Sequence, residues 1–467
     1  MKISYKVLPA DITPEALGYL RDKKIILESS SNNQQKGRYS IVAFEPYGRV
    51  ELNHELLRIW FPSRIIKETL SPYEKLKTFI NQYHEDIKDP SLAHLPFVSG
   101  FIGTCSFDLV RHAFPKLMDI PIEGDSSDLK FYMIESVYVF DHYKELLYVI
   151  SSNLFSEFSE YELDMRVDQM VKALQSVPVF KNDVAFQNED KTITANIDEE
   201  TFKERVNTFK KLIKAGDMFQ VVPSRIYQYK HGFQDQLDSL SYQLYRKLKR
   251  RNPSPYLYYI NLEDDIIVGS SPESFVKVTN NKVTTNPIAG TISRGRDEHE
   301  DCQNAKQLMN DEKELSEHRM LVDLGRNDVH RVSKVGSVSL KKLMDIERFE
   351  HVMHIVSEVE GELKDDISPI EVITSLLPTG TVSGAPKLRA IQRIYETHPY
   401  KRGVYSGGVG YINCNQNLDL ALAIRTMLID DTFVRVEAGC GVVYDSKVEN
   451  ELNETKLKAK SLLEVTP

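Results

Sequence analysis

Apolar residues recur along the chain at both helical and strand spacings. Positions 162–174 and 199–214 have helical spacing, and Gly216 follows the second run, where a left-handed backbone can end a helix. Strand-like runs are Lys24–Leu27, Glu145–Ile150, Tyr256–Ile260, Ile266–Gly269, Ser274–Val278, Val404–Ile412, Leu418–Leu428 and Phe433–Ala438. Because these runs gather in hairpin-like series, the pattern favours an α+β fold with large antiparallel sheets.

A polar, turn-rich stretch at 181–194 interrupts the apolar pattern. We therefore expect two domains, 1–180 and 195–467. A chain of 467 residues is long enough for two or three domains, and its apolar content of 41% is typical of a packed globular protein.

The net charge of −9 argues against a nucleic-acid-binding protein. We expect no membrane association, because no signal peptide is recognisable and no segment approaches about 20 apolar residues. Four scattered cysteines show neither zinc-ligand spacing nor a disulfide framework. These features predict an intracellular, cytoplasmic protein with free thiols.

A helical pattern from Asp311 to Gly325 carries two carboxylates on one face. Glu314 and Glu317 stand three residues apart, in line with Leu321 and Leu324. A buried carboxylate is costly unless it is paired or binds a metal. The alternative is a solvated helix face on which Lys313 pairs with Glu317.

A second helical pattern, from Val448 to Ala459, repeats this spacing with Glu451 and Glu454. Glu451 falls on the apolar stripe, whereas Glu454 lies at its edge, where Lys458 offers an ordinary ion pair. Two helices that each present two carboxylates indicate a hard-cation site, and oxygen ligands favour magnesium.

The run Leu418–Leu428 alternates, with leucines and Ile424 on one face and Ala421, Ala423 and Arg425 on the other. Small alanines beside one arginine leave room for an anion to reach the guanidinium. The alternatives are a solvated edge arginine and an ion pair with Asp419.

A loop at 377–387 leads into a helical pattern, with Ser383 as the expected N-cap and Pro386 in the first turn. The free backbone N–H groups at the start of this helix suit a carboxylate or phosphate ligand. The alternative is a cap that has a structural role only. Glycines recur at 405–411 and 438–442. They indicate places where a ligand approaches the backbone closely, and the alternative is that they form bulges or turns. His354 lies in an apolar stretch, and this pattern alone predicts a histidine buried in the core.

Together these stretches resemble the chorismate-utilising enzymes, and among them the component I proteins of anthranilate synthases. The matching segments cover the whole second half of the chain, and more loosely the first half. They are Ala215–Val221, Ser271–Ser274, Pro287–Thr291, Glu317–Asp328, Pro378–Lys387 and Glu451–Glu454, with Gly100–Gly103 and Phe107–Arg111.

The resemblance implies large antiparallel sheets packed as a sandwich with helices outside, a regulatory N-terminal domain and a catalytic domain at 195–467. It also implies a lyase of the tryptophan pathway that converts chorismate and ammonia to anthranilate and pyruvate. In the related aminodeoxychorismate synthases a lysine nucleophile usually stands where this chain has Ala289, and isochorismate synthases place a water-activating lysine where Gln220 stands. Both departures favour the anthranilate reaction; the aminodeoxychorismate reaction is the alternative.

Residue by residue, the resemblance implies a magnesium site at Glu314, Glu317, Glu451 and Glu454. It gives His354 and Thr381 catalytic roles. The implied substrate contacts are Gly290, Thr291, Tyr405, Arg425, Gly439, Cys440 and Gly441.

The first half resembles a tryptophan feedback pocket of the same family. The implied residues are Leu27, Glu28, Ser29, Arg38, Pro253, Pro255 and Tyr256. An ordinary strand-and-turn pair is the alternative, and the run Ser29–Ser31 and a short following loop depart from the family pattern. A non-catalytic tryptophan-binding regulator is a further alternative, against which the complete set of glutamates, His354 and Arg425 argues.

No cysteine stands on the tight glycine-flanked turn that a glutaminase nucleophile requires. Cys105 lacks the second glycine, and Cys440 has the wrong spacing. The chain is therefore expected to use ammonia directly or to receive it from a separate glutamine amidotransferase subunit (component II).

Overall fold

The computed structural model describes residues 1–29, 37–178, 183, 191–263, 265–348 and 352–465. Within them, eleven strands form one antiparallel sheet. Its order is β1 (Ile3–Pro9), β10 (Leu146–Ser152), β9 (Ser136–Asp141), β3 (Tyr39–Ala43), β2 (Lys24–Glu28), β14 (Tyr256–Asn261), β15 (Ile266–Ser271), β24 (Thr426–Ile429), β25 (Phe433–Gly439), β13 (Ser224–Lys230) and β11 (Thr194–Ala195).

The described residues form a second, twelve-stranded antiparallel sheet. Its order is β18 (Ile288–Ser293), β20 (Val352–Glu362), β17 (Lys282–Thr285), β16 (Ser274–Thr279), β23 (Leu418–Leu422), β22 (Gly408–Asn413), β7 (Gly100–Cys105), β8 (Leu129–Ile134), β4 (Gly48–Asn53), β5 (Leu56–Phe61) and β6 (Arg64–Glu68), with β19 (Ser339–Arg348) on β20. A short ladder joins β12 (Gln220–Val221) and β21 (Gly384–Ala385).

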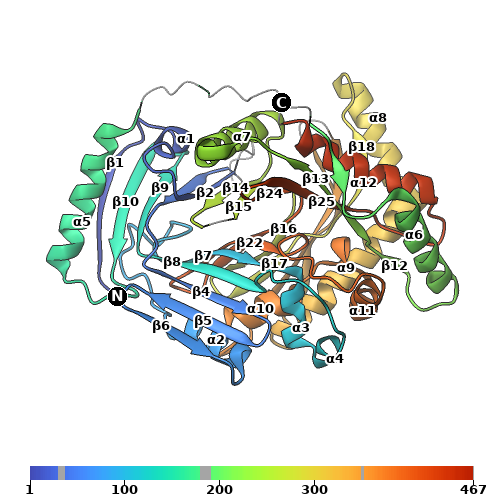
Figure 1. The fold of residues 1–467 in the computed structure, drawn as a ribbon, viewed down its shortest axis with the longest axis horizontal. Coiled ribbons are helices and arrows are strands. Elements are labelled where there is room, and N and C mark those ends of the chain that lie inside the picture. Colours follow the sequence, from blue (N-terminus) through green and yellow to red (C-terminus); the bar gives the residue numbers. More distant parts are fainter. Residues whose placement is uncertain (30–36, 179–182, 184–190, 264, 349–351, 466–467) are drawn as a thin grey trace.

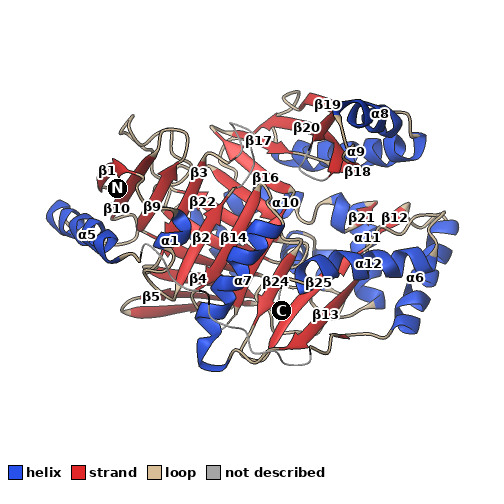
Figure 2. Ribbon diagram, turned by 90° about the horizontal axis from the view of Figure 1, so that it is seen from above, coloured by secondary structure: helices blue, strands red, loops and turns tan. Residues whose placement is uncertain are grey.

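The two sheets pack face to face over a common apolar core. Ile25 and Tyr258 from the first sheet and Ile102 and Ala421 from the second belong to this core and are buried. Successive residues of a strand point to opposite faces, so each sheet also presents a second apolar face outward. The predicted sandwich is therefore confirmed (Figure 2).

Helices cover the outer faces of the sandwich, as predicted (Figure 1). α7 (Leu237–Arg251) packs on the eleven-stranded sheet, and α9 (Glu312–Val332) and α10 (Pro369–Leu376) pack on the twelve-stranded sheet. The other helices are α1 (Pro14–Leu17), α2 (Pro72–Asn81), α3 (Val110–Ala113), α4 (Pro115–Met118), α5 (Glu160–Ala173), α6 (Glu199–Lys214), α8 (Glu298–Met309), α11 (Lys387–Thr397) and α12 (Val448–Leu463).

The helix predicted at 199–214 is confirmed as α6. Its apolar stripe of Phe202, Val206, Phe209 and Ile213 is buried. Gly216 has φ +79°, the left-handed conformation expected just after the helix.

Two predicted strands need correction. The strand expected at Val404–Ile412 begins only at Gly408, because the preceding residues form a turn. The run Leu418–Leu428 is not one strand: β23 ends at Leu422 in one sheet, and β24 starts at Thr426 in the other. The alternation predicted the buried faces of β23 but could not show that the chain then crosses between sheets.

Ser383 is not a helix N-cap. Gly384 and Ala385 pair with β12, so α11 starts later, with Pro386 at the N-cap and no side-chain cap. The Ser383 hydroxyl donates to the Thr379 carbonyl at 2.7 Å and stabilises the loop itself.

Strands from both sides of the expected domain boundary share each sheet, as two blocks that meet at one pair of strands. In the first sheet β2 pairs with β14, and in the second β7 pairs with β22. Most of the boundary stretch at 181–194 lies outside the described residues. The division into regulatory and catalytic domains stays a prediction.

None of the helices that the structure describes is both long enough and apolar enough to span a bilayer.

Candidate functional site

α9 presents its two carboxylates on a partly buried face. Asp311 caps the helix by accepting from the N–H groups of Lys313 and Glu314 at 3.0 and 3.2 Å. Glu314 and Glu317 are half-buried, and Leu321 in the same line is buried. No Lys313–Glu317 ion pair occurs among the described residues, so the solvated-face alternative lacks the pair on which it rested.

α12 presents the second pair of carboxylates. Glu451 is buried on the predicted stripe with Thr455, Ala459 and Leu462. Glu454 forms an ion pair with Lys458 at 2.6 Å, as its edge position indicated.

The carboxylates of the two helices lie close enough to interact. Burial, followed by the charge of Glu314, raises the pKa of Glu317, and the charges of Glu454 and Glu451 act in the same direction. Burial also raises the pKa of Glu451, whose Oε2 has no hydrogen-bond partner in the part of the chain that the structure describes. Apart from Glu454, which pairs with Lys458, none of the four carboxylates forms an ion pair with a described residue.

This unneutralised charge fits a hard cation. No group of three or more His, Cys, Asp or Glu side chains is clustered tightly enough to hold a metal, as far as the described ranges extend. Magnesium is commonly held by one or two carboxylates and completes its shell with water and substrate oxygens. The orphaned Oε2 of Glu451 and the oxygen-only donor set thus suit magnesium without a closed protein cage.

Arg425 lies where the chain crosses between the sheets. Its φ of +50° is unusual for a non-glycine residue. The guanidinium makes no hydrogen bond or ion pair with any described residue, and burial lowers its pKa even though part of the side chain is exposed. The alternative partner Asp419 instead pairs with Lys277 at 3.5 Å and accepts from Tyr256 at 3.0 Å. An unpaired guanidinium in a partly enclosed place is suited to a bound carboxylate.

Tyr405 lies near the same crossing. Ser406, next in the chain, donates its N–H to the Ala423 carbonyl at 2.9 Å. The Tyr405 hydroxyl approaches Gly439 so closely that a Cβ there would lie 2.7 Å from it. Gly439 is therefore required by close packing, and burial raises the pKa of Tyr405 and keeps its hydroxyl neutral.

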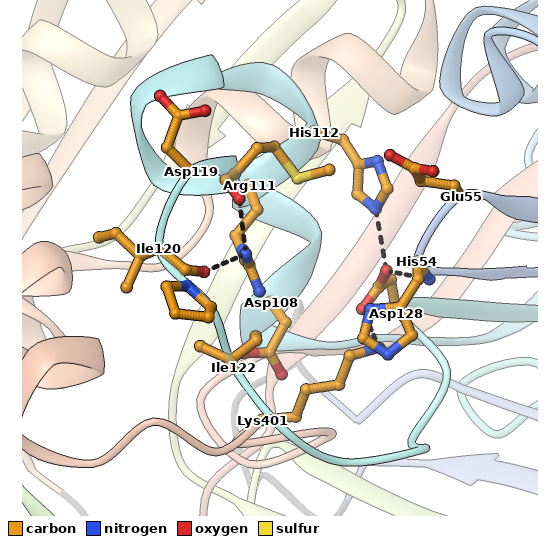
Figure 3. Close-up of a pocket in the computed structure, with 12 residues that line it drawn as sticks. His54, Glu55, Asp108, Arg111, His112, Asp119, Ile120, Ile122, Asp128 and Lys401 are labelled. Carbon is orange, nitrogen blue, oxygen red and sulfur yellow. Dashed lines mark hydrogen bonds and ion pairs between the residues drawn. The ribbon is translucent and has the colours of Figure 1, made fainter.

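A cavity of about 440 Å³ adjoins the segment that carries Tyr405 (Figure 3). In its wall Asp128 accepts from His112 Nε2 at 2.9 Å and from Lys401 Nζ at 2.8 Å, and Asp108 accepts from the Gly403 N–H at 2.9 Å. These buried contacts hold both ends of the Lys401–Gly403 run, which leads directly into Tyr405. The cavity wall thus fixes the run of residues that precedes Tyr405.

His354 contacts two of the predicted substrate residues. Its Nδ1 donates to the Gly290 carbonyl at 2.9 Å and lies 3.0 Å from Thr291 Oγ1. Because a carbonyl only accepts, Nδ1 carries the proton, and the neutral ring has its lone pair on Nε2. Burial and then the charge of Arg425 lower the pKa of His354, so the ring is neutral near pH 7.

Glu273 is a functional candidate that the sequence motif contained but to which no role was given. It is buried, and Thr381 Oγ1 donates to its carboxyl at 2.9 Å. Burial raises the pKa of Glu273 to about 7, and the charge of Lys458 opposes the shift. A carboxylic acid that is half protonated near pH 7 suits proton donation. Only the tertiary contact with Thr381 singles Glu273 out among the acidic residues.

The glycine-rich end of β25 is only partly free to bind a ligand through its backbone. The Cys440 N–H donates to the Pro223 carbonyl at 3.2 Å, and the Gly439 carbonyl accepts from Lys458 at 2.9 Å. A Cβ on Gly441 would lie 2.9 Å from the Gln220 amide nitrogen. Glycine at 441 therefore makes room for Gln220, whose buried Oε1 has no hydrogen-bond partner within the described ranges.

The two halves of the predicted inhibitor pocket lie side by side. β2 pairs with β14 in the register Glu28–Leu257, which brings Ser29 beside the start of β14 at Pro255 and Tyr256. Glu28 accepts from Lys249 at 2.8 Å and from the Tyr245 hydroxyl, and Arg38 pairs with Asp141. Ser30 and Ser31 lie outside the described residues. The Ser29 hydroxyl and the Asn252 amide nitrogen are buried there, and neither has a hydrogen-bond partner among the described residues.

A family model described as "chorismate binding enzyme" matches residues 23–464. The chain belongs to the chorismate-binding enzyme family. It is 40% identical over 466 residues to "Anthranilate synthase component 1" of Lactococcus lactis, covering 98% of this chain and 99% of the relative. It is 39% identical to the protein of the same name from Acetivibrio thermocellus, covering 94% of this chain and 89% of that one.

Solved structures of chorismate-binding enzymes share the fold. Anthranilate synthase component I from Streptococcus pneumoniae superposes with a TM-score of 0.80 at 36% identity, covering 97% of this chain and 98% of that one. The Escherichia coli menaquinone-specific isochorismate synthase MenF gives 0.74 at 17% identity, covering 100% and 95%, which is a likeness of fold alone. A chorismate-binding enzyme must hold two carboxylates, and the guanidinium of Arg425, which is unpaired among the described residues, is suited to one of them.

Proposed function

We propose that the protein is an anthranilate synthase component I that converts chorismate and ammonia to anthranilate and pyruvate in tryptophan biosynthesis. The observation that carries the proposal is the Arg425 guanidinium, which has no partner among the described residues and whose charge acts on His354. Together with a cation held by the four glutamates, it would give each carboxylate of chorismate a positive partner. The names of the full-length relatives support the same reaction.

Glu317 and Glu454 would hold a magnesium ion, with Glu314 and Glu451 contacting it directly or through water. When bound, the ion supplies positive charge that anchors the ring carboxylate and favours departure of the ring hydroxyl. Arg425 and Tyr405 bind the enolpyruvyl carboxylate. Gly290, Thr291 and Thr381 line the ring, and the Gly439–Gly441 backbone adjoins the enolpyruvyl group.

Glu273 acts in the first chemical step. A bond forms between ammonia nitrogen and a ring carbon, and the bond to the ring hydroxyl breaks. Glu273, held by Thr381, gives its proton to that oxygen, which leaves as water. A pKa of about 7 allows the acid form to be present at neutral pH.

His354 acts in the second step. The bond between the ring and the enolpyruvyl oxygen breaks with its electron pair going to that oxygen, and a ring proton is removed as the ring becomes aromatic. The departing enolate takes a proton from water at its methylene carbon and becomes pyruvate. The lone pair on Nε2 of the neutral imidazole accepts the proton removed from the substrate ring, while Gly290 and Thr291 hold the other imidazole nitrogen.

Two positions favour ammonia added directly to the ring. Ala289 offers no amine to form a covalent intermediate, which disfavours the aminodeoxychorismate reaction. Gln220 is not a base, so it does not activate water as a lysine does in isochorismate synthases. The Oε1 atom of Gln220, which has no partner among the described residues, can accept a hydrogen bond from a ligand but cannot remove a proton from it.

The ammonia is proposed to come from solution or from a separate glutamine amidotransferase subunit. Burial raises the pKa of Cys105 to about 12 and also raises the pKa of Cys440 well above its usual value, so neither is a thiolate at neutral pH. The chain alone should use ammonium and not glutamine.

One assay tests the main proposal. The purified chain is incubated with chorismate, magnesium and ammonium, and the product is identified by fluorescence and mass spectrometry. Anthranilate and pyruvate in equal amounts are expected. Aminodeoxychorismate would support the alternative enzyme, and absence of turnover would support a non-catalytic regulator.

Substitution of Arg425 by alanine is expected to raise the KM for chorismate. Loss of a charged hydrogen bond costs about 1.5–3 kcal/mol, which corresponds to about 10- to 150-fold. Arg435→Ala, which removes a strand arginine paired with Asp430, is the matched control and should change KM little. An unchanged KM in Arg425→Ala would count against the carboxylate role.

We also propose that tryptophan binds beside Ser29 and inhibits the enzyme. Two unpartnered buried polar groups, the Ser29 hydroxyl and the Asn252 amide, and the nearby charges of Glu28 and Lys249 support an amino-acid ligand there. Pro253, Pro255 and Tyr256 with Leu27 and Arg38 complete the proposed pocket. Ordinary strand pairing explains the backbone contacts but not the two orphaned groups.

Ser29→Leu is expected to abolish inhibition by tryptophan, because the larger side chain fills the place of the ligand. Calorimetry should detect no tryptophan binding, while the KM for chorismate without tryptophan stays near its original value. Inhibition that persists at the original tryptophan concentration would move the pocket elsewhere.

A further inference from the structure

Ser270 lies between the proposed tryptophan pocket and Arg425. It belongs to β15, and its side chain is completely buried. β14 lies on one side of it, in the register Leu257–Ser270, and the crossing segment that contains Arg425 lies on the other. Its position allows contact with both sites at once.

The side chain of Ser270 contacts the pocket segment. Its hydroxyl lies 2.5 Å from the Asn252 carbonyl and 2.8 Å from the Ser254 hydroxyl. Both partners belong to the Asn252–Tyr256 segment that forms one wall of the proposed pocket. A shift of this segment would therefore break or displace hydrogen bonds of Ser270.

The main chain of Ser270 contacts Arg425. The Ser270 N–H donates to the Arg425 carbonyl at 3.1 Å. Arg425 has a left-handed backbone, which costs a non-glycine residue energy and persists only where neighbours hold it. The orientation of the guanidinium thus depends on the contacts that keep this backbone in place.

A second contact joins β14, the strand that continues from the Asn252–Tyr256 segment, to the residue after Arg425. The Tyr258 hydroxyl and Thr426 Oγ1 lie 2.6 Å apart, and Thr426 directly follows Arg425. Gly269 packs against the Tyr258 ring so closely that a Cβ there would lie 2.0 Å from it. Close packing of this kind transmits a displacement instead of absorbing it.

We propose that Ser270 is a positioning residue that couples the Asn252–Tyr256 segment to Arg425. An amino acid bound beside Ser29 and Asn252 shifts this segment, Ser270 transmits the shift, and Arg425 loses its alignment with the enolpyruvyl carboxylate. The inhibitor then acts by raising the KM for chorismate. This inference rests on the proposed function and on tryptophan as the ligand.

Ser270→Ala tests the coupling, because it removes both side-chain hydrogen bonds and leaves the N–H that binds Arg425. Tryptophan affinity is measured by calorimetry, and the KM for chorismate is measured with and without saturating tryptophan. We expect the tryptophan Kd to change less than threefold, while the rise in KM that tryptophan causes falls at least tenfold. Ser254→Ala, which removes one of the two bonds, should give an intermediate loss.

Ser241→Ala is the matched control. Ser241 is equally buried, and its hydroxyl lies 2.9 Å from the Tyr259 hydroxyl, away from Arg425. This variant should keep full inhibition, which separates coupling from the general cost of losing a buried serine.

The outcomes distinguish the inference from the function on which it rests. If the unaltered protein does not bind tryptophan, the proposed regulation fails and the inference fails with it. If Ser270→Ala binds tryptophan and is inhibited as before, the coupling role is wrong. If Ser270→Ala no longer binds tryptophan, Ser270 is part of the pocket, which also contradicts the proposal. If Ser270→Ala does not fold, retention of full inhibition in Ser254→Ala overturns it.

Discussion

Glu317→Gln is expected to abolish magnesium-dependent formation of anthranilate while the chain stays folded. The substitution keeps the shape of the side chain and removes the charge that, together with Glu454, would hold the ion. Turnover should fall at least 100-fold at saturating magnesium. Glu312→Gln, an exposed residue of the same helix, is the matched control and should keep its activity.

A second measurement on Glu317→Gln does not depend on activity. The pKa of Glu317 is raised in the folded chain, so ionisation of this residue opposes folding, and its cost to stability appears as the pH rises above the ordinary value of the group. In metal-free buffer at pH 7 the variant should therefore have a Tm at least as high as the original protein. Added magnesium should raise the Tm of the original protein and not that of the variant. Full activity of the original protein in excess EDTA would contradict the metal assignment.

Glu273→Gln is expected to lower kcat by about 10²- to 10⁴-fold, the usual contribution of a general acid. Glutamine keeps the contact with Thr381 but has no proton of suitable acidity to give to the leaving hydroxyl. In the original protein kcat should fall as the pH rises through about 7, because the acid form of Glu273 is lost. This falling limb should be absent from the residual activity of the variant.

Glu437→Gln provides the control for the pH profile. Burial also raises the pKa of Glu437 to about 7, but its carboxyl accepts from Ser224 and is not bonded to Thr381. A Glu437→Gln variant should keep the falling limb. If that limb disappears in Glu437→Gln and persists in Glu273→Gln, the general acid has been assigned to the wrong residue.

The spacing of apolar residues was sufficient to predict a helix or strand where burial of one of its own faces determines the structure. The apolar spacing of α6 and the position of Gly216 were predictable because a helix buries a stripe with its own period. The same reasoning held for the buried face of α12, including Glu451. Motif resemblance correctly identified the family, since many ordered segments match along the chain.

Local pattern failed where distant segments decide the structure. Ser383 has the residue type of an N-cap, but the pairing of β21 with β12 delays the helix. The alternation of residue types around Arg425 resembled a single strand. Alternation shows which side chains are buried, but it does not show which of the two sheets buries them. Glu273 was indistinguishable from other glutamates until Thr381 and the surrounding core gave it a hydrogen bond and a raised pKa.

The sequence by itself determined the α+β class, the family, the two acidic helices and most of the residue types that the chemistry requires. Only the tertiary structure decided that α9 and α12 bring their carboxylates within reach of each other, that the Arg425 guanidinium has no partner among the described residues, and that Ser270 contacts both Asn252 and Arg425. The reason is physical. Spacing along a chain fixes which residues share a face, whereas charge interaction, burial and hydrogen bonding depend on segments that meet only when both sheets have formed.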